Sequence, residues 1–185
     1  NKWASRHFGI EVTPKKEGGH ISLKIKQTVG GGEANIADLG FGFSQMLPIA
    51  VQLWAAGTNS VQPIPGRRTS ASSLIVIEQP ELHLHPDYQA KLADVFVASV
   101  TDEKGADSSM KKKAMFIIAE THSADLVNRL GALVAEGKIG AEDVQVILFE
   151  QIDSNSPSTL KTANFDADGV LTDWPTGFFT PSVYS

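Results

Sequence analysis

The sequence has no cysteine among its 185 residues, which excludes disulfide bonds and thiolate metal sites. It has no apolar run that approaches the roughly 18 residues of a membrane-spanning helix, and its first residues lack the apolar core of a signal peptide. The formal net charge is −5, so the composition offers no argument for binding to nucleic acid. These absences predict a cytoplasmic protein that is not inserted in a membrane.

The chain also lacks the phosphate-binding pattern G-x-x-x-x-G-K-[ST]. The nearest approach runs from Gly131 to Lys138 with the wrong spacing, and Ile139 stands where the pattern requires Ser or Thr. A nucleotide site built by this sequence alone would therefore lack the loop that holds the phosphate groups. If such a site exists, the sequence supplies one half of it.

The residues that are present have a composition typical of a globular domain, with 42% hydrophobic and 20% charged residues. We expect a single domain over residues 1–185, made of an N-terminal hairpin segment, an α/β core and a C-terminal tail. These three parts are predicted to cover residues 1–37, 38–150 and 151–185.

Both ends of the chain predict hairpins. Apolar and polar residues alternate over Phe8–Val12 and over Ile21–Lys26, and glycines lie between the two runs. This period of two predicts an antiparallel hairpin with one solvated face. A second, C-terminal hairpin is predicted over Leu160–Asp173.

Between the N-terminal hairpin and the core, apolar spacing predicts a helix over Ser44–Trp54. Ser44 is the predicted N-cap, and Pro48 is tolerable because it lies close to the first turn. Residues 57–72 are rich in Gly, Pro, Ser and Thr, and they predict an unusually long loop.

From Leu74 onward, apolar strands alternate with amphipathic helices. Strand–helix–strand repeats form right-handed crossovers, so this order predicts a parallel sheet with buried strands. Ligands of such a sheet bind at the carboxyl ends of its strands, where Glu78 and Glu120 both lie. The predicted strands are Leu74–Ile77, Met115–Ile118 and Val144–Phe149, and the predicted helices are Pro86–Val100 and Ser123–Glu136.

The segment from Leu74 to Pro86 reads LIVIEQPELHLHP, in which an apolar strand ends in acidic groups. A carboxylate in this position suits Mg²⁺, which prefers hard oxygen ligands and keeps much of its hydration shell. Glu78 is therefore the candidate magnesium ligand. The competing interpretation is a carboxylate that makes a salt bridge or caps the following helix.

Two further segments carry groups that suit a phosphate. Ala119–Ser123 places His122 at a helix start, where a histidine can hydrogen-bond a phosphate or an attacking water. Upstream, Leu39–Gln45 places glycines and Ser44 at another helix start, where backbone N–H groups and a hydroxyl can meet an anion. Taken alone, each segment is also consistent with ordinary helix capping.

In this order, the three segments together resemble the ABC-type ATPases of the SMC, RecF and OLD group, and most closely the prokaryotic AAA-family ATPases found near defence and repair systems. The resemblance covers nearly the whole chain. It identifies Gly42–Gln45 with the signature, Leu74–Glu78 with the Walker B strand, Leu84–Pro86 with the D-loop, His122 with the switch histidine and Asp173–Phe179 with the C-terminal end.

The resemblance implies a P-loop NTPase-like α/β fold, of which this chain is the C-terminal lobe, with ATP and Mg²⁺ as cofactors. The Walker A lysine would then belong to an N-terminal lobe of the same protein. The implied assembly is a homodimer closed around two nucleotides, with DNA or an effector protein as a further partner and a role in DNA repair or anti-phage defence. Nucleotide contacts are implied for Gly42, Ser44, Gln45 and His85, with Ser44 binding the γ-phosphate in trans, Glu78 ordering magnesium and His122 sensing the γ-phosphate.

Gln79 departs from the family pattern, in which a catalytic glutamate follows the Walker B acid. An amide can orient water but cannot accept its proton, and general-base assistance is worth about 10² to 10⁴ in rate. We therefore expect slow hydrolysis, with Gln79 orienting water poorly, unless Glu81 or His122 takes the role of the base.

Two alternatives remain open. His83 and His85 are two residues apart, and with Glu81 they could offer a ligand set for zinc or manganese. The chain could instead be a protein-interaction or regulatory module with an ATPase-like fold and no catalytic activity.

Overall fold

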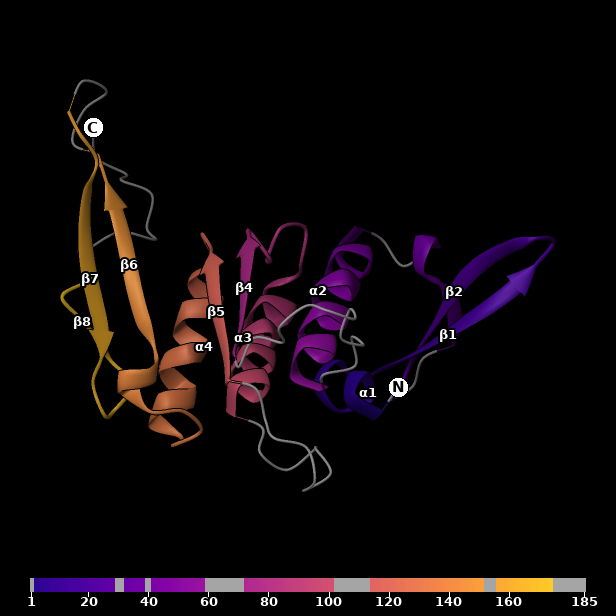
Figure 1. Ribbon diagram of the computed structural model, residues 1–185, viewed down its shortest axis with the longest axis horizontal. Helices are drawn as coiled ribbons and strands as arrows, with labels where there is room; N and C mark the ends of the chain where they lie inside the picture. Colours follow the sequence, from indigo (N-terminus) through magenta and orange to yellow (C-terminus); the bar gives the residue numbers. More distant parts are fainter. Residues whose placement is uncertain are drawn as a thin grey trace, which may run out of the picture.

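The computed structural model describes residues 2–28, 32–38, 41–58, 72–101, 114–151 and 156–174. Its elements follow one another along the long axis of the molecule (Figure 1). An antiparallel sheet lies at the N-terminal end, an α/β core lies in the middle, and a second antiparallel sheet lies at the other end. The candidate site belongs to the central part.

The N-terminal sheet contains three antiparallel strands in the order β1-β2-β3, which confirms the predicted hairpin. Gly18 and Gly19 form its turn with φ angles of 56° and 86°, which glycine adopts without strain. Phe8 was predicted in the first strand but ends helix α1, because Gly9 turns the chain at a φ of 66°. The elements are α1 (Lys2–Phe8), β1 (Ile10–Glu17), β2 (His20–Gln27), β3 (Glu33–Asn35) and the 3-10 helix η1 (Ile36–Asp38).

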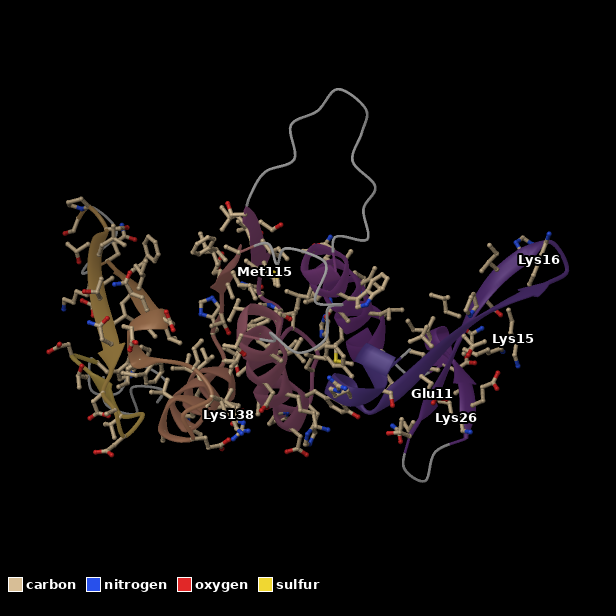
Figure 2. All side chains as sticks on the ribbon, turned by 60° about the horizontal axis from the view of Figure 1, so that its bottom comes forward. Glu11, Lys15, Lys16, Lys26, Met115 and Lys138 are labelled. Carbon is tan, nitrogen blue, oxygen red and sulfur yellow. The ribbon has the colours of Figure 1, made fainter. Side chains whose placement is uncertain are left out.

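Charged side chains project from this sheet, among them Glu11, Lys15, Lys16 and Lys26 in Figure 2. Lys15 forms an ion pair with Glu33 of β3, and its hydrogen bond lowers the pKa of the Glu33 carboxyl. Both side chains are exposed, so solvent screens the pair and its contribution to stability is small. The sheet surface is therefore solvated, as the alternation of residues predicts.

Helix α2 (Phe41–Thr58) begins three residues before Ser44, so the prediction that Ser44 is the N-cap is wrong. Tertiary packing extends the helix, because its first turn lies against the loop that follows β4. A Cβ added at Gly42 would lie only 3.1 Å from the carbonyl oxygen of His83. Pro48 lies inside the helix and beyond its first turn, where its ring nitrogen cannot donate the usual backbone hydrogen bond.

The core is built on two parallel strands, β4 and β5, and this pairing confirms part of the predicted sheet. Helix α3 packs against β5, and α4 packs along α3. Ile77 and Met115 are buried on the face of the strands that the helices cover, and Leu92 and Leu126 are buried within the helical layer. The bounds are β4 (Ser72–Glu78), α3 (Pro86–Thr101), β5 (Ala114–Glu120) and α4 (Ala124–Ala135).

An ion-pair network also connects the two helices. Arg129 of α4 contacts Asp94 of α3 at 2.7 Å and Glu136 at 2.8 Å. Hydrogen bonds to Asp94 and then to Glu136 raise the pKa of Arg129 above its ordinary value. The pair to Asp94 is made through two guanidinium nitrogens, so it fixes the relative position of α3 and α4.

The other face of β4 and β5 is open, so the prediction of fully buried strands is wrong. Leu74 and Val76 are 61% and 62% exposed, and Phe116 and Ile118 are 59% and 56% exposed. Because side chains alternate between faces, Glu78 and Glu120 stand on this same side of the sheet. In the part of the chain that the structure describes, this apolar face has no cover.

The third predicted strand of the parallel sheet does not join it, which corrects the expected topology. Strand β6 pairs antiparallel with β7, and β8 completes a separate three-stranded sheet that contains the predicted C-terminal hairpin. Strand–helix alternation predicts where strands occur but not which strands pair. Here β7, the first strand of the C-terminal hairpin, is the partner of β6. The bounds are η2 (Ala141–Asp143), β6 (Gln145–Glu150), β7 (Thr159–Phe165) and β8 (Leu171–Thr172).

Two predicted segments fall largely outside the described residues. The loop 57–72 is described only where it ends α2 and begins β4, and the C-terminal segment Asp173–Phe179 is described only up to Trp174. Among the helices that are described, none combines the length and the hydropathy needed to cross a bilayer.

Candidate functional site

A cavity of about 580 Å³ lies between helix α2 and the carboxyl ends of β4 and β5. The carboxyl ends of strands are where open α/β sheets bind their ligands, and this volume is typical of a small-molecule site. The structure thus brings the predicted signature segment and the predicted magnesium ligand to one place. The polar lining residues are Ser44, Gln45, Glu78, Gln79 and Glu120, and the apolar ones are Pro48, Ile49, Ile77, Pro80 and Leu82.

Glu78 and Glu120 occupy matching register positions at the ends of the two strands, and both are exposed. Neighbouring strands lie roughly 4.8 Å apart, so the two carboxyl groups start from adjacent positions. Gln79 is fixed beside them, because its N–H donates to the carbonyl oxygen of Glu120 at 2.9 Å. Its φ of 44° is uncommon for a residue with a side chain and marks a constrained turn at the site. These oxygen-bearing groups fit a hard divalent cation such as Mg²⁺.

Gln45 lines this cavity and also carries an unsatisfied buried acceptor. Its Oε1 atom is buried and has no hydrogen-bond partner among the described residues. Buried polar atoms are normally hydrogen-bonded, so this oxygen is a polar group that the described residues leave uncompensated.

Glu81 lies on the other side of the same loop and does not line the cavity. It is only 9% exposed, and its Oε1 accepts a hydrogen bond from the backbone N–H of His122 at 2.7 Å. The second carboxylate oxygen, Oε2, is buried without a partner among the described residues. The carboxyl group is therefore held against the loop after β5.

Gln89 of α3 makes a second connection between the two loops. Its Nε2 donates to the carbonyl oxygen of Leu84 at 2.9 Å, and its Oε1 accepts from the hydroxyl of Ser123 at 2.6 Å. The Ser123 hydroxyl in turn accepts from the N–H of Leu126 at 3.1 Å and caps α4. Gln89 could not be chosen from the sequence, because a glutamine on a helix gives no local sign of such a contact.

The histidines lie at the edge of this arrangement. His122 and His85 are exposed, and neither lines the cavity. The Nδ1 of His85 accepts from the N–H of Asp87 at 3.3 Å, at the start of α3. In the described ranges, no group of three or more His, Cys, Asp and Glu is arranged to hold a metal ion, so Glu81, His83 and His85 do not form the zinc or manganese site considered above.

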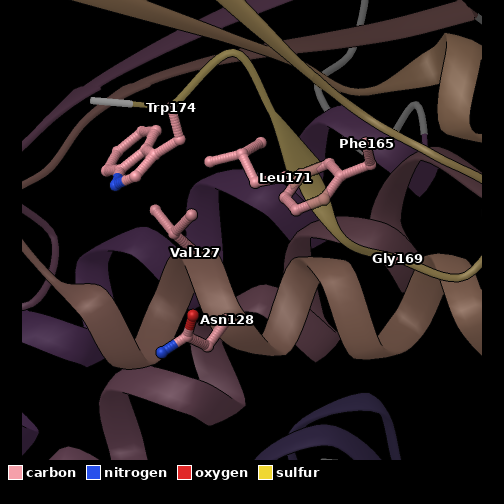
Figure 3. Close-up of a pocket in the computed structure, with 6 residues that line it drawn as sticks. All are labelled: Val127, Asn128, Phe165, Gly169, Leu171 and Trp174. Atoms are coloured by element: carbon pink, nitrogen blue, oxygen red, sulfur yellow. The ribbon is translucent and has the colours of Figure 1, made fainter. Parts of the chain in front are cut away.

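A second, smaller cavity of about 140 Å³ lies between α4 and the C-terminal sheet (Figure 3). Its apolar lining residues are Phe165, Leu171, Trp174 and Val127. The amide of Asn128 is directed away from Phe165 and Leu171. None of the candidate site residues lines this cavity, so it is separate from the candidate site.

Comparison with protein families connects the larger cavity to a known class of proteins. A family model described as an AAA ATPase domain matches residues 7–127, which is more than half of the chain. Comparisons with curated proteins and with solved structures return no match. The matched range contains every residue that lines the larger cavity, as well as Glu81 and His122. On this match, the chain belongs to the AAA ATPase domain family.

Proposed function

We propose that the chain is the C-terminal lobe of an ABC-type ATPase of the SMC, RecF and OLD-like group. ATP would bind between this lobe and an N-terminal lobe of the same protein that carries the Walker A loop. The observation that carries the proposal is that Ser44, Glu78 and Gln79 line the same cavity, at the carboxyl ends of β4 and β5. Membership of the AAA ATPase domain family supports ATP chemistry at this position.

Glu78 is the residue that would hold Mg²⁺, directly or through water, because it ends β4 and lines the cavity. When bound, Mg²⁺ would supply positive charge that stabilises the phosphate groups. Gln45 lines the same cavity and would contact the nucleotide beside Ser44.

The open face of β4 and β5 supports the proposal of a second lobe. Its four exposed apolar residues are Leu74, Val76, Phe116 and Ile118, and covering them would stabilise a complex by about 25 cal/mol for each Å² of apolar surface buried. Glu78 and Glu120 end the same face, so a lobe packed there would bring its phosphate-binding loop to the carboxylates. Strands β5 and β6 also have edges without a strand partner in the described part, to which a further strand could add.

Hydrolysis needs a proton acceptor, and the amide of Gln79 cannot supply one. Glu81 faces the backbone of His122 and not the cavity. Glu78 is assigned to magnesium, which leaves Glu120 as the remaining carboxylate in the lining, next to Gln79. We assign to Glu120 the role of general base, which accepts the proton of the attacking water. The water oxygen bonds to the γ-phosphorus, the bond from that phosphorus to the bridging oxygen breaks, and ADP leaves with the electron pair of that bond.

Closure of two copies around two nucleotides would place Ser44 of each copy against the γ-phosphate held by the other. His122 would sense that phosphate from the loop after β5. The cycle of closure and opening would act on DNA or on an effector protein, in DNA repair or in anti-phage defence. Since Ser44 and Glu78 of one chain line one cavity, the alternative is that both serve the same nucleotide in cis.

Mixing two inactive variants of the full-length protein tests both the activity and the trans arrangement. Ser44→Arg and Glu78→Gln are each expected to abolish hydrolysis, because they alter the signature and the magnesium ligand. In randomly mixed dimers, half of the molecules contain one intact composite site, so about a quarter of the wild-type rate should return.

The other possible outcomes of the mixing experiment distinguish three alternatives. A mixture that stays inactive would show that Ser44 serves the nucleotide of its own chain. Wild-type rates in both single variants would refute the assignment of this cavity as the ATPase site. A wild-type protein that neither binds nor hydrolyses ATP would favour the non-catalytic interaction module.

A further inference from the structure

We infer that Glu81 is a positioning residue, which holds the backbone of His122. It makes the loop after β4 (residues 79–85), which leads into the D-loop, move together with the loop after β5 (residues 121–123), which carries the switch histidine. The names of the two loops rest on the proposed function, whereas the contact between them does not. The link joins residues 41 positions apart in the sequence, at 2.7 Å from Oε1 to the amide nitrogen.

The burial of Glu81 indicates that this contact is more than a surface interaction. A carboxylate that is 9% exposed loses most of its hydration, and a buried polar group is unfavourable unless it is hydrogen-bonded. Oε2 has no partner among the described residues. Within these residues, the hydrogen bond from the His122 N–H to Oε1 is therefore what offsets the cost of removing the carboxylate from water. Glu81 therefore stabilises one specific position of the loop after β5.

The same loop is in contact with the start of α2. Gly42 lies so close to the carbonyl oxygen of His83 that an added Cβ would be 3.1 Å away, and 3.1 Å from the Leu84 side chain. Gln79 and His83 have positive φ angles of 44° and 61°, which constrain the loop between them. A displacement of α2 or of the loop by a second subunit would thus reach His122 through Glu81.

Gln89 connects the same two loops at other atoms, independently of Glu81. It holds the carbonyl of Leu84 on one side and the capping hydroxyl of Ser123 on the other, and both contacts are independent of Glu81. Removal of the Glu81 carboxyl should therefore release the backbone at His122 while the cap at Leu126 stays formed. This difference distinguishes a local positioning role from a general loss of structure.

Amide hydrogen exchange on this chain tests the contact directly. In Glu81→Ala, exchange at the His122 amide should become about tenfold faster, as expected for the loss of one hydrogen bond, and exchange at Leu126 should not change. Glu81→Gln keeps an acceptor oxygen and should retain most of the protection. Glu142→Gln, at an exposed carboxylate on η2, is the matched control and should leave both amides unchanged.

ATP hydrolysis by the full-length protein tests the consequence for function. Glu81→Ala should lower kcat about tenfold with KM changed less than about twofold, because it displaces a γ-phosphate sensor and leaves the binding groups in place. Glu81→Gln should recover most of kcat. A residue with a purely structural role would not give this separation of kcat from KM together with rescue by the amide.

Unchanged exchange at His122 in Glu81→Ala would overturn the inference. Faster exchange with an unchanged kcat, in a background where the wild type is active, would also overturn it, because the contact would then not position the histidine for the reaction. An inactive wild-type protein would count against the proposed function alone, since the exchange experiment needs no ATPase activity.

Discussion

Replacement of Glu120 with glutamine is expected to lower kcat for ATP hydrolysis by the full-length protein by about 10² to 10⁴. The amide keeps the size and the hydrogen-bonding atoms of the side chain, but it cannot accept the proton of the attacking water. Glu120 lines the cavity beside Gln79, and with Glu78 assigned to magnesium no other carboxylate of the lining is available. Affinity for ATP and Mg²⁺ should change by less than about threefold, because the nucleotide contacts are retained.

Steady-state kinetics and calorimetric titration of the same protein samples would check this result. The double variant Gln79→Glu with Glu120→Gln places a carboxylate at the position hydrogen-bonded to residue 120 and should regain part of the lost rate. Glu142→Gln serves again as the control, since Glu142 is exposed outside the cavity. A wild-type kcat in Glu120→Gln would contradict the assignment of the base, and a loss of Mg²⁺ binding would make Glu120 a metal ligand instead.

Gly131→Val is expected to destabilise the chain by about 3 kcal/mol, because the added side chain has no space where α4 meets the C-terminal sheet. A Cβ at Gly131 would overlap the carbonyl oxygen of Gly169, and it would lie 3.0 Å from the ring of Phe165. Gly169 has a φ of 74° and cannot move away without changing the turn between β7 and β8. The region around this contact is drawn in Figure 3.

Thermal unfolding followed by circular dichroism should show the effect of Gly131→Val as a fall in Tm of about 10 °C for a chain of this size. Ala132→Val, at an exposed position of the same helix, is the matched control and should cost only about 0.5 kcal/mol in helix propensity. Equal effects of the two substitutions would show that the close approach of Gly131 to Gly169 does not hold the sheet to α4.

Much of the fold follows from local patterns in the sequence. The alternation of residues predicts the β1–β2 hairpin. Short apolar runs predict β4 and β5, and helical spacing predicts α3 and α4, all close to their observed bounds. Local patterns fail where the partner of a strand or the start of a helix depends on distant residues. β6 pairs with β7 and not with the parallel strands, and α2 starts early because Gly42 packs against the loop after β4.

In the candidate site, too, some residues could be predicted from local sequence patterns and others depend on contacts between distant segments. Glu78, Gln79 and Ser44 could be chosen from the sequence, because a strand end and a glycine-rich helix start mark them, and the structure places all three at one cavity. Glu120 is also predicted at the carboxyl end of its strand. Its register opposite Glu78, and the contact of Glu81 with His122 that crosses from one loop to another, do not follow from the sequence. Such contacts depend on tertiary structure and leave no local signal.

Calorimetric titration of ATP with Mg²⁺ into this chain and into the full-length product of its gene is the most direct test of the central claim, that the chain forms one half of an ATPase site. We predict saturable binding by the full-length protein and none by the chain alone, because the chain has the carboxylates but lacks the phosphate-binding loop. Equal binding by both would contradict the half-site. Absence of binding in both would contradict the ATPase function and leave an ATPase-like scaffold for protein interaction.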